Sequence, residues 1–576
     1  MEEKIDIRQP LPVGREELVD LTRVLQDYKA GKTGTEKRIV DSETWWKLRN
    51  TRQEQGYISR SGWLHNVIVS KHADAMESYP EPVILPREES DRQEAKMLSS
   101  ILPCILEQNR FQQVYSDVTW QKLKTGTGVY KVVWDGGKLN GLGDIAIEKV
   151  NLLNLYWEPG VTDIQKSRYL FHTELVDREL LQKQYPELRN ADKSQTFLSA
   201  RFLYDDTVRT DDKVTVIECY YHKDGRLHYV KYAGVQVLYA TENDPALWDR
   251  GLYDHGLYPY VFDALFPIEG SPCGYGFVDL CRSPQMEIDL LKTAFVKNAM
   301  VGATPRYFKR QDGGVNEQEF LDLSRPLVNV SGNLGEDSLR QIDFRPLDGI
   351  YVSVLDRTIQ ELRETSGNTE TSSGNISAGV TAAAAIAALQ EASGKGSRDA
   401  SLSAYRAFSE VVTLSIELIR QFYDLPRQFR ILGELGEQQF VSYTNAGLRL
   451  QSQGAEFGLD LGMRRPEFDI RVSAQKHSAY TRVSQNELAL QFFKLGFFNP
   501  AMAEQALATL DMMDFDGRDR LMQRIAANAR QFRLQQLQLS AAGSMPSLRR
   551  EEPDSVTRAR ARAAEAASPA GEGAVT

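Results

Sequence analysis

A polar loop that passes into an alanine tract constrains this chain more than any other stretch, and it extends from Glu364 to Ser397. Its first half, rich in Ser, Thr, Asn and Gly, cannot bury enough apolar surface to offset the entropy lost on ordering. Inside a large protein, such a segment is expected where a mobile polar loop is useful. The alanine-rich stretch Thr381–Ala392 has little side-chain bulk, so it predicts a helix that packs closely. Gly394 and Gly396 then permit a sharp bend, and Ser397 can cap the next helix.

Amphipathic helices are predicted on both sides of this loop. Ile288, Leu291 and Phe295 form one apolar stripe on a helix from about Pro284 to Val301. After Gly349 a second helix carries a similar stripe, made of Val352, Leu355, Ile359 and Leu362. Between the two helices lie short strand-like runs separated by glycine-rich turns, namely Arg306–Lys309, Leu327–Val330 and Gln341–Arg345. Beyond the loop, a helix from Tyr405 to Tyr423 has an apolar face formed by Phe408, Val412, Ile416 and Ile419.

The residues before about Phe277 predict a mixed domain of helices and strands. Helical periodicity is found in Glu16–Ala30, Trp63–Ser78 and Arg92–Gln108. Alternating patterns predict a first hairpin from Val129–Trp134 and Asp144–Val150, and a second from Val214–Tyr221 and Leu227–Ala240. Asp224-Gly225 favours a tight turn in the second hairpin. The domain is therefore expected to be α+β.

The residues after Tyr423 predict two strands and then three helices. The strands are Gln438–Tyr443 and Phe468–Ala474. Ser484 with Glu487 forms a capping-box signature for the first helix, which ends near Gly496. Asn499 then caps a helix that begins at Pro500, and Asp516–Leu539 forms the third. Beyond Ser540 the chain lacks aromatic residues, which predicts a disordered tail.

Composition limits the classes of function. The net charge is -10, which argues against tight binding of nucleic acid, because such binding rests on neutralisation of phosphates by Lys and Arg. A channel that lets DNA slide is a different case, because a weak or mixed surface charge is then an advantage. No signal peptide or membrane-spanning stretch is recognisable, so a cytosolic site of synthesis and no membrane partner are expected. The four cysteines are too few and too scattered to form a disulfide framework.

No catalytic constellation is recognisable. Gly31-Lys32-Thr33 and Gly394-Lys395 both lack the upstream glycine of a phosphate-binding loop, so these residues are interpreted as loop glycines. The seven histidines are dispersed, and no HExxH motif is present. The cluster of aspartates between Asp511 and Asp519 has neither the spacing nor the distal Glu of a calcium loop. The chain is therefore expected to be no enzyme and to need no cofactor or metal.

Paired helices that flank a small β insertion and lead into a polar loop resemble the portal proteins of tailed bacteriophages, the head-to-tail connectors. More specific pieces of the resemblance are RSGWLHNVIVSKHADAMESYPEPVILPREE from Arg60, GDIAIEKVNLLNLYWEPGVTDIQKSRYL from Gly143 and GYGFVDLCRSPQMEIDLL from Gly274. The resemblance implies an α+β portal fold with an α/β wing, paired stem helices, a small β-containing clip, a kinked tunnel helix and a short helical crown. The expected divisions are a wing in 1–280 and 425–477, stem helices in 281–303 and 349–366, a clip in 304–348, a tunnel loop in 367–381, a kinked tunnel helix in 382–424, a crown in 478–540 and a disordered tail in 541–576.

The resemblance also implies a function. Portal subunits form a ring, a dodecamer in mature particles, at one vertex of the virion capsid, and the viral genome passes through its pore during packaging and ejection. Expected partners are further copies of the chain, double-stranded viral DNA, the major capsid protein and scaffold, the terminase, and the head-completion or tail adaptor. Assembly would take place in the host cytoplasm. The alternatives are a capsid or head-tail structural protein without a channel, and a DNA-packaging enzyme.

Two sets of residues are candidates for the DNA channel. The first is basic and surrounds the first stem helix: Lys292, Lys297, Arg306, Lys309 and Arg310. It is explained equally well by a solvated helix face with salt bridges to ring neighbours and by transient phosphate contacts. The second belongs to the polar loop: Asn368, Thr369, Glu370, Ser372, Ser373, Asn375 and Ser377. This loop is interpreted as a compliant guide for DNA, with a surface loop outside any channel as the alternative, and Gly394 and Gly396 are the candidate hinge.

Overall fold

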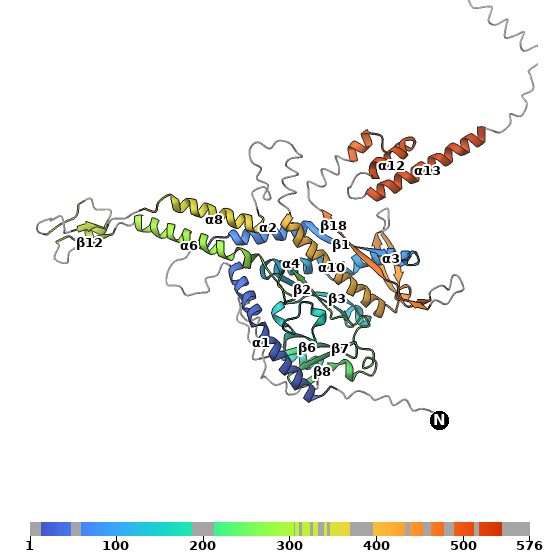
Figure 1. Cartoon of the computed structure of the whole chain (residues 1–576), viewed down its shortest axis with the longest axis horizontal. Helices are drawn as coiled ribbons and strands as arrows, with labels where there is room; N and C mark the ends of the chain where they lie inside the picture. The colour runs from blue at the N-terminus through green and yellow to red at the C-terminus, as the bar shows by residue number, and fades with distance from the viewer. Residues whose placement is uncertain are drawn as a thin grey trace, which may run out of the picture. The chain divides into compact units, whose positions relative to one another are not determined.

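Helices and strands both contribute to the fold, as expected for an α+β chain. The computed structural model describes residues 13–47, 59–186, 212–303, 306–309, 314–322, 327–331, 339–342, 346–368, 395–432, 438–452, 462–476, 489–511 and 518–543. The chain divides into two compact units, residues 1–476 and residues 477–576, whose elements are drawn in Figure 1. In the described residues, no helix combines the length and the apolar character that a bilayer crossing requires.

A three-stranded antiparallel sheet lies at the centre of the first unit. Its strand order is β3-β2-β9, with β2 at Thr127–Asp135, β3 at Asp144–Lys149 and β9 at Tyr260–Ala264. Helices α3 (Arg92–Gln108), α4 (Phe111–Thr125) and α10 (Lys395–Phe422) contribute to the same apolar core. The predicted helix Arg92–Gln108 and the predicted first hairpin are confirmed. The apolar face predicted for the helix after the loop is confirmed as well, because Phe408, Val412, Ile416 and Ile419 are all buried.

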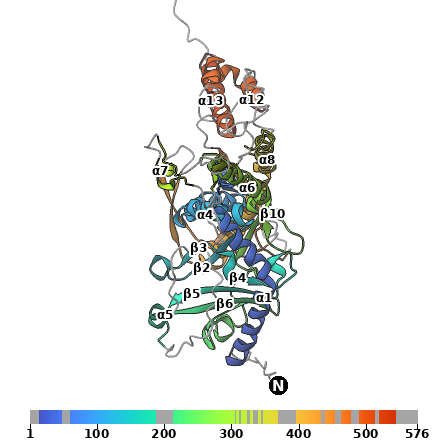
Figure 2. The same cartoon turned by 90° about the vertical axis from the view of Figure 1, so that its left-hand side faces the viewer.

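A second, five-stranded antiparallel sheet has its strands in sequential order. These are β4 (Leu155–Trp157), β5 (Tyr169–Asp177), β6 (Lys213–Lys223), β7 (Arg226–Ala233) and β8 (Gln236–Ala240). Asp224 and Gly225 both have positive φ, so the predicted tight turn is confirmed. The stretch predicted as one strand from Leu227 to Ala240 is two strands, because Gly234 also has positive φ and turns the chain back. Helix α1 (Arg15–Trp46) packs Leu18 and Leu25 against this sheet, and Figure 2 shows it beside β4.

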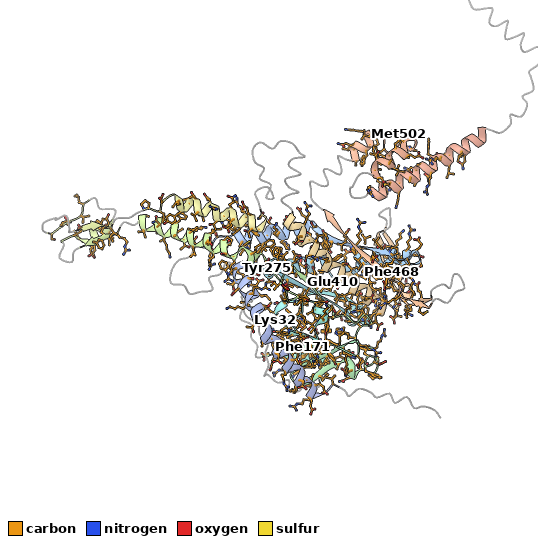
Figure 3. The ribbon with its side chains drawn as sticks, viewed as in Figure 1. Lys32, Phe171, Tyr275, Glu410, Phe468 and Met502 are labelled. Atoms are coloured by element: carbon orange, nitrogen blue, oxygen red, sulfur yellow. The ribbon has the colours of Figure 1, made fainter. Side chains whose placement is uncertain are left out.

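The sequence interpretation of Gly31-Lys32-Thr33 as a loop is wrong, since these residues lie inside the 32-residue helix α1. A Cβ atom at Gly31 would lie 2.6 Å from Cγ of Pro159, so glycine allows a close approach of the helix. Lys32, labelled in Figure 3, is buried, and its ammonium donates to the backbone oxygens of Leu152 and Leu155. Burial lowers the pKa of Lys32 to about 8. The motif therefore joins α1 to the sheet.

A two-stranded ribbon joins parts of the chain that are far apart in sequence. Strand β1 (Ser78–Pro86) pairs antiparallel with β18 (Phe468–Lys476) directly after helix α2 (Trp63–Glu77). Pro80 and Pro82 lie within β1, where a two-stranded ribbon tolerates the missing N–H groups. The remaining elements of this region are α5 (Arg178–Gln184), β10 (Phe266–Pro267), β11 (Gly274–Tyr275), β14 (Arg427–Leu432), β15 (Gln438–Tyr443), β16 (Gln451–Ser452) and β17 (Met463–Arg464). The predicted strands Gln438–Tyr443 and Phe468–Ala474 are confirmed.

Helices α6 (Phe277–Ala303) and α8 (Ile350–Ser366) bracket the small insertion. The insertion contains the antiparallel pair β12 (Tyr307–Lys309) and β13 (Leu339–Gln341), and the short helix α7 (Glu317–Leu321). Of the predicted run Leu327–Val330, only Val330 pairs, in a single bridge to Val315. The predicted run Gln341–Arg345 overlaps β13 only at Gln341, and 343–345 lie outside the described residues.

The second unit is helical in its described residues. It contains a helix at 489–494, a 3-10 turn at Pro500–Met502, and helices α12 (Ala503–Asp511) and α13 (Arg518–Gly543) around buried Phe492, Leu510 and Ile525. Gly496 has a positive φ after the first helix, as predicted. Pro500 begins the 3-10 turn, so the helix predicted to begin there begins at Ala503. Helix α13 extends three residues into 541–576, the segment predicted to be disordered, and Ser484 and Glu487 lie outside the described residues.

A buried charge cluster joins the two large sheets. Nζ of Lys131 on β2 lies 2.7 Å from Oε2 of Glu218 on β6, and Nδ1 of His172 on β5 lies 3.3 Å from the same oxygen. The Glu218 side chain is only 11% exposed. Burial alone would raise the pKa of Glu218, but Lys131 and His172 together hold it well below its usual value.

We expect Glu218→Gln to lower the free energy of unfolding by about 3 kcal/mol at neutral pH, because it leaves the Lys131 ammonium buried without its carboxylate. A lowered folded-state pKa means that ionised Glu218 stabilises the fold above the ordinary glutamate pKa of about 4.3. This contribution is lost as the pH falls toward the folded-state value, so the difference between the two proteins should narrow in acid. Urea unfolding followed by tryptophan fluorescence measures the difference.

Glu174→Gln is the matched control, since Glu174 is exposed on β5 of the same sheet. Equal stabilities of the Glu218→Gln and Glu174→Gln proteins at neutral pH would show that the charge cluster does not hold the sheets together.

Candidate functional site

Helices α6 and α8 form the most distinctive part of the first unit, and Figure 1 shows them side by side, with β12 beyond their ends. Ile288 and Leu362 are buried in one apolar cluster, with Leu355 and Ile359 packed against it. Oδ1 of Asn298 accepts a hydrogen bond of 3.3 Å from the N–H of Leu347, near the far end of the pair. Ile288, Leu355, Ile359 and Leu362 of the predicted stripes therefore join α6 to α8 within one chain. The prediction is wrong for Val352, which is 50% exposed.

Helix α8 ends where the polar loop begins. Gly367 has φ 65°, and its N–H donates to the oxygen of Glu364 at 3.1 Å, while the N–H of Asn368 donates to the oxygen of Arg363 at 3.0 Å. These bonds satisfy carbonyl groups that the helix would otherwise leave unpaired. The loop is thus preceded by a firmly terminated helix.

A second face of α6 binds the segment that leads into α2. Gln285, Asp289 and Thr293 lie at successive turns of α6 and are buried. Their side-chain oxygens accept backbone N–H groups from Leu64, Ser61 and Ser59, respectively, at 2.8 to 2.9 Å. The N–H of Leu64 belongs to the first turn of α2, so α6 supplies the cap that the sequence around Gly62 lacks. The sequence analysis missed these three residues, although polar side chains at four-residue spacing beside an apolar stripe are a recognisable signal.

Four of the seven tryptophans contribute to the apolar cluster at the start of α6 and the end of α8. Each has a cationic or histidine neighbour: Trp45 has Arg60 and Arg282, Trp46 has His65 and Lys124, Trp63 has Arg363, and Trp120 has His72. Cations over aromatic faces are attracted by the ring quadrupole. This junction attaches the helix pair to α1, α2 and α4.

The predicted basic residues do not share one face. Lys292 and Lys297 are exposed on α6, but residues five positions apart project about 140° from one another around a helix. Arg306 is exposed just before β12, Lys309 ends β12, and Arg310 lies outside the described residues. Arg282, nearer the start of α6, interacts with Trp45 and lies 3.8 Å from Asp41.

An apolar stripe runs along the outer side of α6 and includes Lys297. Met286, Leu290 and Val301 are 47%, 57% and 46% exposed, and the spacing of these residues places them and Lys297 on one line of the helix. A similar outer stripe on α8 contains Ile350 and Val354, together with the exposed Arg357 and Glu361. The sequence analysis missed both, because it assigned the apolar positions of these helices to a single stripe each.

Of the predicted loop residues, only Asn368 is described, and it is partly buried beside the end of α8. Thr369, Glu370, Ser372, Ser373, Asn375 and Ser377 lie outside the described residues, as does Gly394. Gly396 and Ser397 are in the first turn of α10, which begins at Lys395. The expectation that Ser397 caps this helix is therefore wrong, since the helix has already begun two residues earlier.

A buried ion pair holds the first turns of α10. Nζ of Lys122 on α4 lies 2.6 Å from Oδ1 of Asp263 on β9, with the two side chains 3% and 2% exposed. The same ammonium donates to the oxygen of Ala400 at 3.1 Å, and Oγ of Ser403 donates to Oδ1 of Asp263 at 2.9 Å. Helix α10 is thus pinned at Ala400 and Ser403, so any bend at the preceding loop must occur before Ala400. The sequence analysis had no signal for this contact, because its members come from three distant segments.

Across the described part of the chain, no group of His, Cys, Asp and Glu side chains could hold a metal ion. The Cys219, Cys273 and Cys281 thiols are buried, and burial raises the pKa of each, which suits packing more than nucleophilic chemistry. The described features are the exposed apolar stripes of α6 and α8, the pair that these two helices form, and helix α10 held by Lys122 and Asp263.

Two comparisons with known proteins bear on this arrangement. A model of the family described as phage P22-like portal protein matches residues 73–250 and 263–571 of the chain, well over half of its length. A search of curated proteins found no match. The matched residues include α6, the insertion, α8, α10 and the second unit.

We expect Lys122→Met to lower the free energy of unfolding by about 3 kcal/mol, because it leaves the Asp263 carboxylate buried and unpaired. Hydrogen exchange at the amides of Ala404–Val411 on α10 should become faster, since the pin at Ala400 is removed. The double variant Lys122→Met with Asp263→Leu removes both charges and should recover most of the stability. If the single and double variants are equally stable, the pair does not hold α10.

Proposed function

We propose that this chain, which belongs to the phage P22-like portal protein family, forms the ring-shaped channel through which a tailed phage packages and ejects its DNA. The family match over residues 73–250 and 263–571 carries the proposal. Membership implies a structural role at the capsid portal vertex. The channel, the ring and the docking partners go beyond the family match and are our proposal.

The proposed ring rests on the two outer stripes of the helix pair. Closed rings are built from heterologous contacts, in which two different patches of each subunit meet. The stripe of Met286, Leu290 and Val301 on α6 and the stripe of Ile350 and Val354 on α8 are two such patches. The α6 stripe also contains Lys297, and the α8 stripe contains both Glu361 and Arg357. We therefore propose that α6 of one subunit packs against α8 of the next, in a dodecamer like that implied by the resemblance.

The parts of the chain have proposed roles within this ring. Helices α6 and α8 are the stem, and the insertion between them is the clip, where the terminase and later the head-completion or tail adaptor would dock. The two sheets with α1 to α4 are the wing, which would meet the major capsid protein and scaffold. The second unit is the crown. DNA contacts would be transient and independent of sequence, since the chain is acidic overall.

The loop after α8 is the proposed DNA guide. It follows the terminated end of α8 and precedes α10, whose first turns are pinned by Lys122 and Asp263. Because Ala400 is held, movement of the loop would be absorbed between Asn368 and Ala400, a stretch that includes Gly394 and Gly396. The loop would then yield to passing DNA and resist backward slippage without moving the wing. Lys292 and Lys297 project from different sides of α6, so at most one of them would face a common pore.

We expect the purified chain to form rings with an open axial pore in electron-microscope top views. Leu290→Asp should convert most rings to smaller species, because each subunit contact loses about 2 kcal/mol of apolar burial and gains a buried charge. Native mass spectrometry measures the ring mass. Leu180→Asp is the control, since Leu180 is 54% exposed on helix α5 and lies outside the proposed contact.

A monomer or a closed shell formed by the unaltered chain would reject the channel. Intact rings of the Leu290→Asp protein would leave the channel in place but reject the proposed α6 contact.

We expect deletion of Thr369–Ser377 to leave ring assembly intact, because the deleted residues include none of the proposed subunit contacts. Packaging or retention of the genome should be impaired, since the polar guide would be shortened. DNA content per head, compared with heads built on the full-length chain, measures the effect. Full and stable DNA content in the deletion heads would contradict the proposed role of the loop.

A further inference from the structure

Helix α13 has one face that no described element of the second unit covers. Its apolar side packs Ile525 into the core with Phe492 and Leu510, and Figure 2 shows α13 beside α12. On another side, five exposed residues follow one another at spacings of four and three: Arg524, Asn528, Gln531, Gln535 and Gln538. This spacing keeps them on one line of the helix, and Arg520 occupies the position one turn before Arg524. We call these six positions the Arg/amide face.

The Arg/amide face contains donors and no acid. Helix α13 has five arginines and a single acidic residue, Asp519, whereas the whole chain has a net charge of -10. Two of the other arginines are used within the unit, because Arg533 pairs with Glu504 and Arg518 donates to the oxygen of Asp511 at 3.4 Å. Arg524, by contrast, has no acidic partner within ion-pair distance among the described residues. Positive charge is therefore concentrated on one exposed helix of an acidic protein.

This combination of side chains fits a phosphate backbone. Arginine and the amide side chains of Asn and Gln donate hydrogen bonds to phosphate oxygens, and such contacts bear no sequence information. A neighbouring copy fits less well. Contacts around a ring join two different faces of neighbouring subunits. The Arg/amide face would therefore have to meet acidic side chains on the second unit of the neighbouring copy. Glu504 of that unit already pairs with Arg533.

We propose that the Arg/amide face of α13 binds the phosphate backbone of double-stranded DNA without reading its sequence. The inference rests on the proposed function, because a portal ring brings DNA to the protein, but it adds a second contact that is separate from the loop and from α6. Repetition around a ring would make a contact that is weak in one subunit measurable and salt-sensitive in the whole assembly.

Binding of a short linear DNA duplex to the full-length ring tests the proposal, with two duplexes of unrelated sequence measured over a range of salt concentrations. Arg520→Gln with Arg524→Gln should weaken binding to both duplexes by roughly tenfold or more at low salt, and the slope of log affinity against log salt should become shallower by about 0.9 for each phosphate that the protein no longer neutralises. Arg520→Lys with Arg524→Lys keeps the charge and should retain the original slope. Lys166→Gln with Lys183→Gln is the matched control for charge removal elsewhere, since both residues are exposed on the first unit and belong to neither the proposed subunit contact nor the proposed DNA contacts.

Weaker binding by the glutamine variant, rescue by the lysine variant and an unchanged ring mass support the proposal. Unchanged affinity and slope, a preference for one duplex, or no measurable binding by the unaltered ring would overturn it. Loss of ring mass in the glutamine variant would also overturn it, by assigning the face to contacts between copies. Failure of the proposed channel function can be distinguished from failure of the α13 contact. The first would appear as the absence of a ring with a pore in electron-microscope views, and the second as unchanged DNA binding by an intact ring.

Discussion

The buried pair of Lys122 and Asp263 is the contact on which the arrangement of the first unit depends. It joins α4, β9 and α10, three elements from distant parts of the chain, and the same ammonium holds the oxygen of Ala400. A charge pair this deeply buried is costly to form and costlier to break from one side, so it favours a single position of α10. Helix α10 is therefore fixed to the core of the first unit from Ala400 onward.

Helix α6 has three sides with different environments: one packs against α8, one binds the segment before α2, and one is exposed. Ile288 faces α8, Asp289 receives the backbone of the segment before α2, and Leu290 faces away from both. Consecutive residues point about 100° apart, so three neighbours in sequence reach three different environments. The apolar stripe facing α8 stabilises the subunit. The outer stripe is exposed within the subunit, and the polar face fixes the helix to the body. Truncation of any one of these side chains would therefore affect a different surface of the helix.

Elements defined by local periodicity or by turn residues were predicted well from the sequence, whereas the predicted helix N-caps at Ser397 and Asn499 were not. Arg92–Gln108 and Gln438–Tyr443 have the predicted bounds, and the Asp224-Gly225 turn is as expected, because each depends on local patterning. Elements that depend on distant partners were predicted poorly. Gly31 was assigned to a loop, yet it lies in α1, where its missing side chain admits Pro159. Helix α6 begins at Phe277 and passes through Pro284, since burial of Phe277 and Cys281 outweighs the helix-breaking tendency of proline. Of the candidate site, the basic residues were found, but their division between different sides of α6 was not.

The sequence by itself determined the order of the elements, the polar loop between its helices, the acidic balance of the chain and the resemblance to portal proteins. These follow from composition, periodicity and motifs, which are properties of neighbouring residues. Only the tertiary structure decided that part of each predicted stripe closes the α6 and α8 pair within one subunit and that Lys122 pins α10. It also decided that Gln285 caps α2, while Asp289 and Thr293 bind the backbone that precedes it. The hydrogen bonds among them join residues more than one hundred positions apart in the chain. The apolar contacts join α6 to α8 across the insertion that separates these helices in the sequence. Their formation depends on burial and on the pairing of polar groups away from water, which no local pattern encodes.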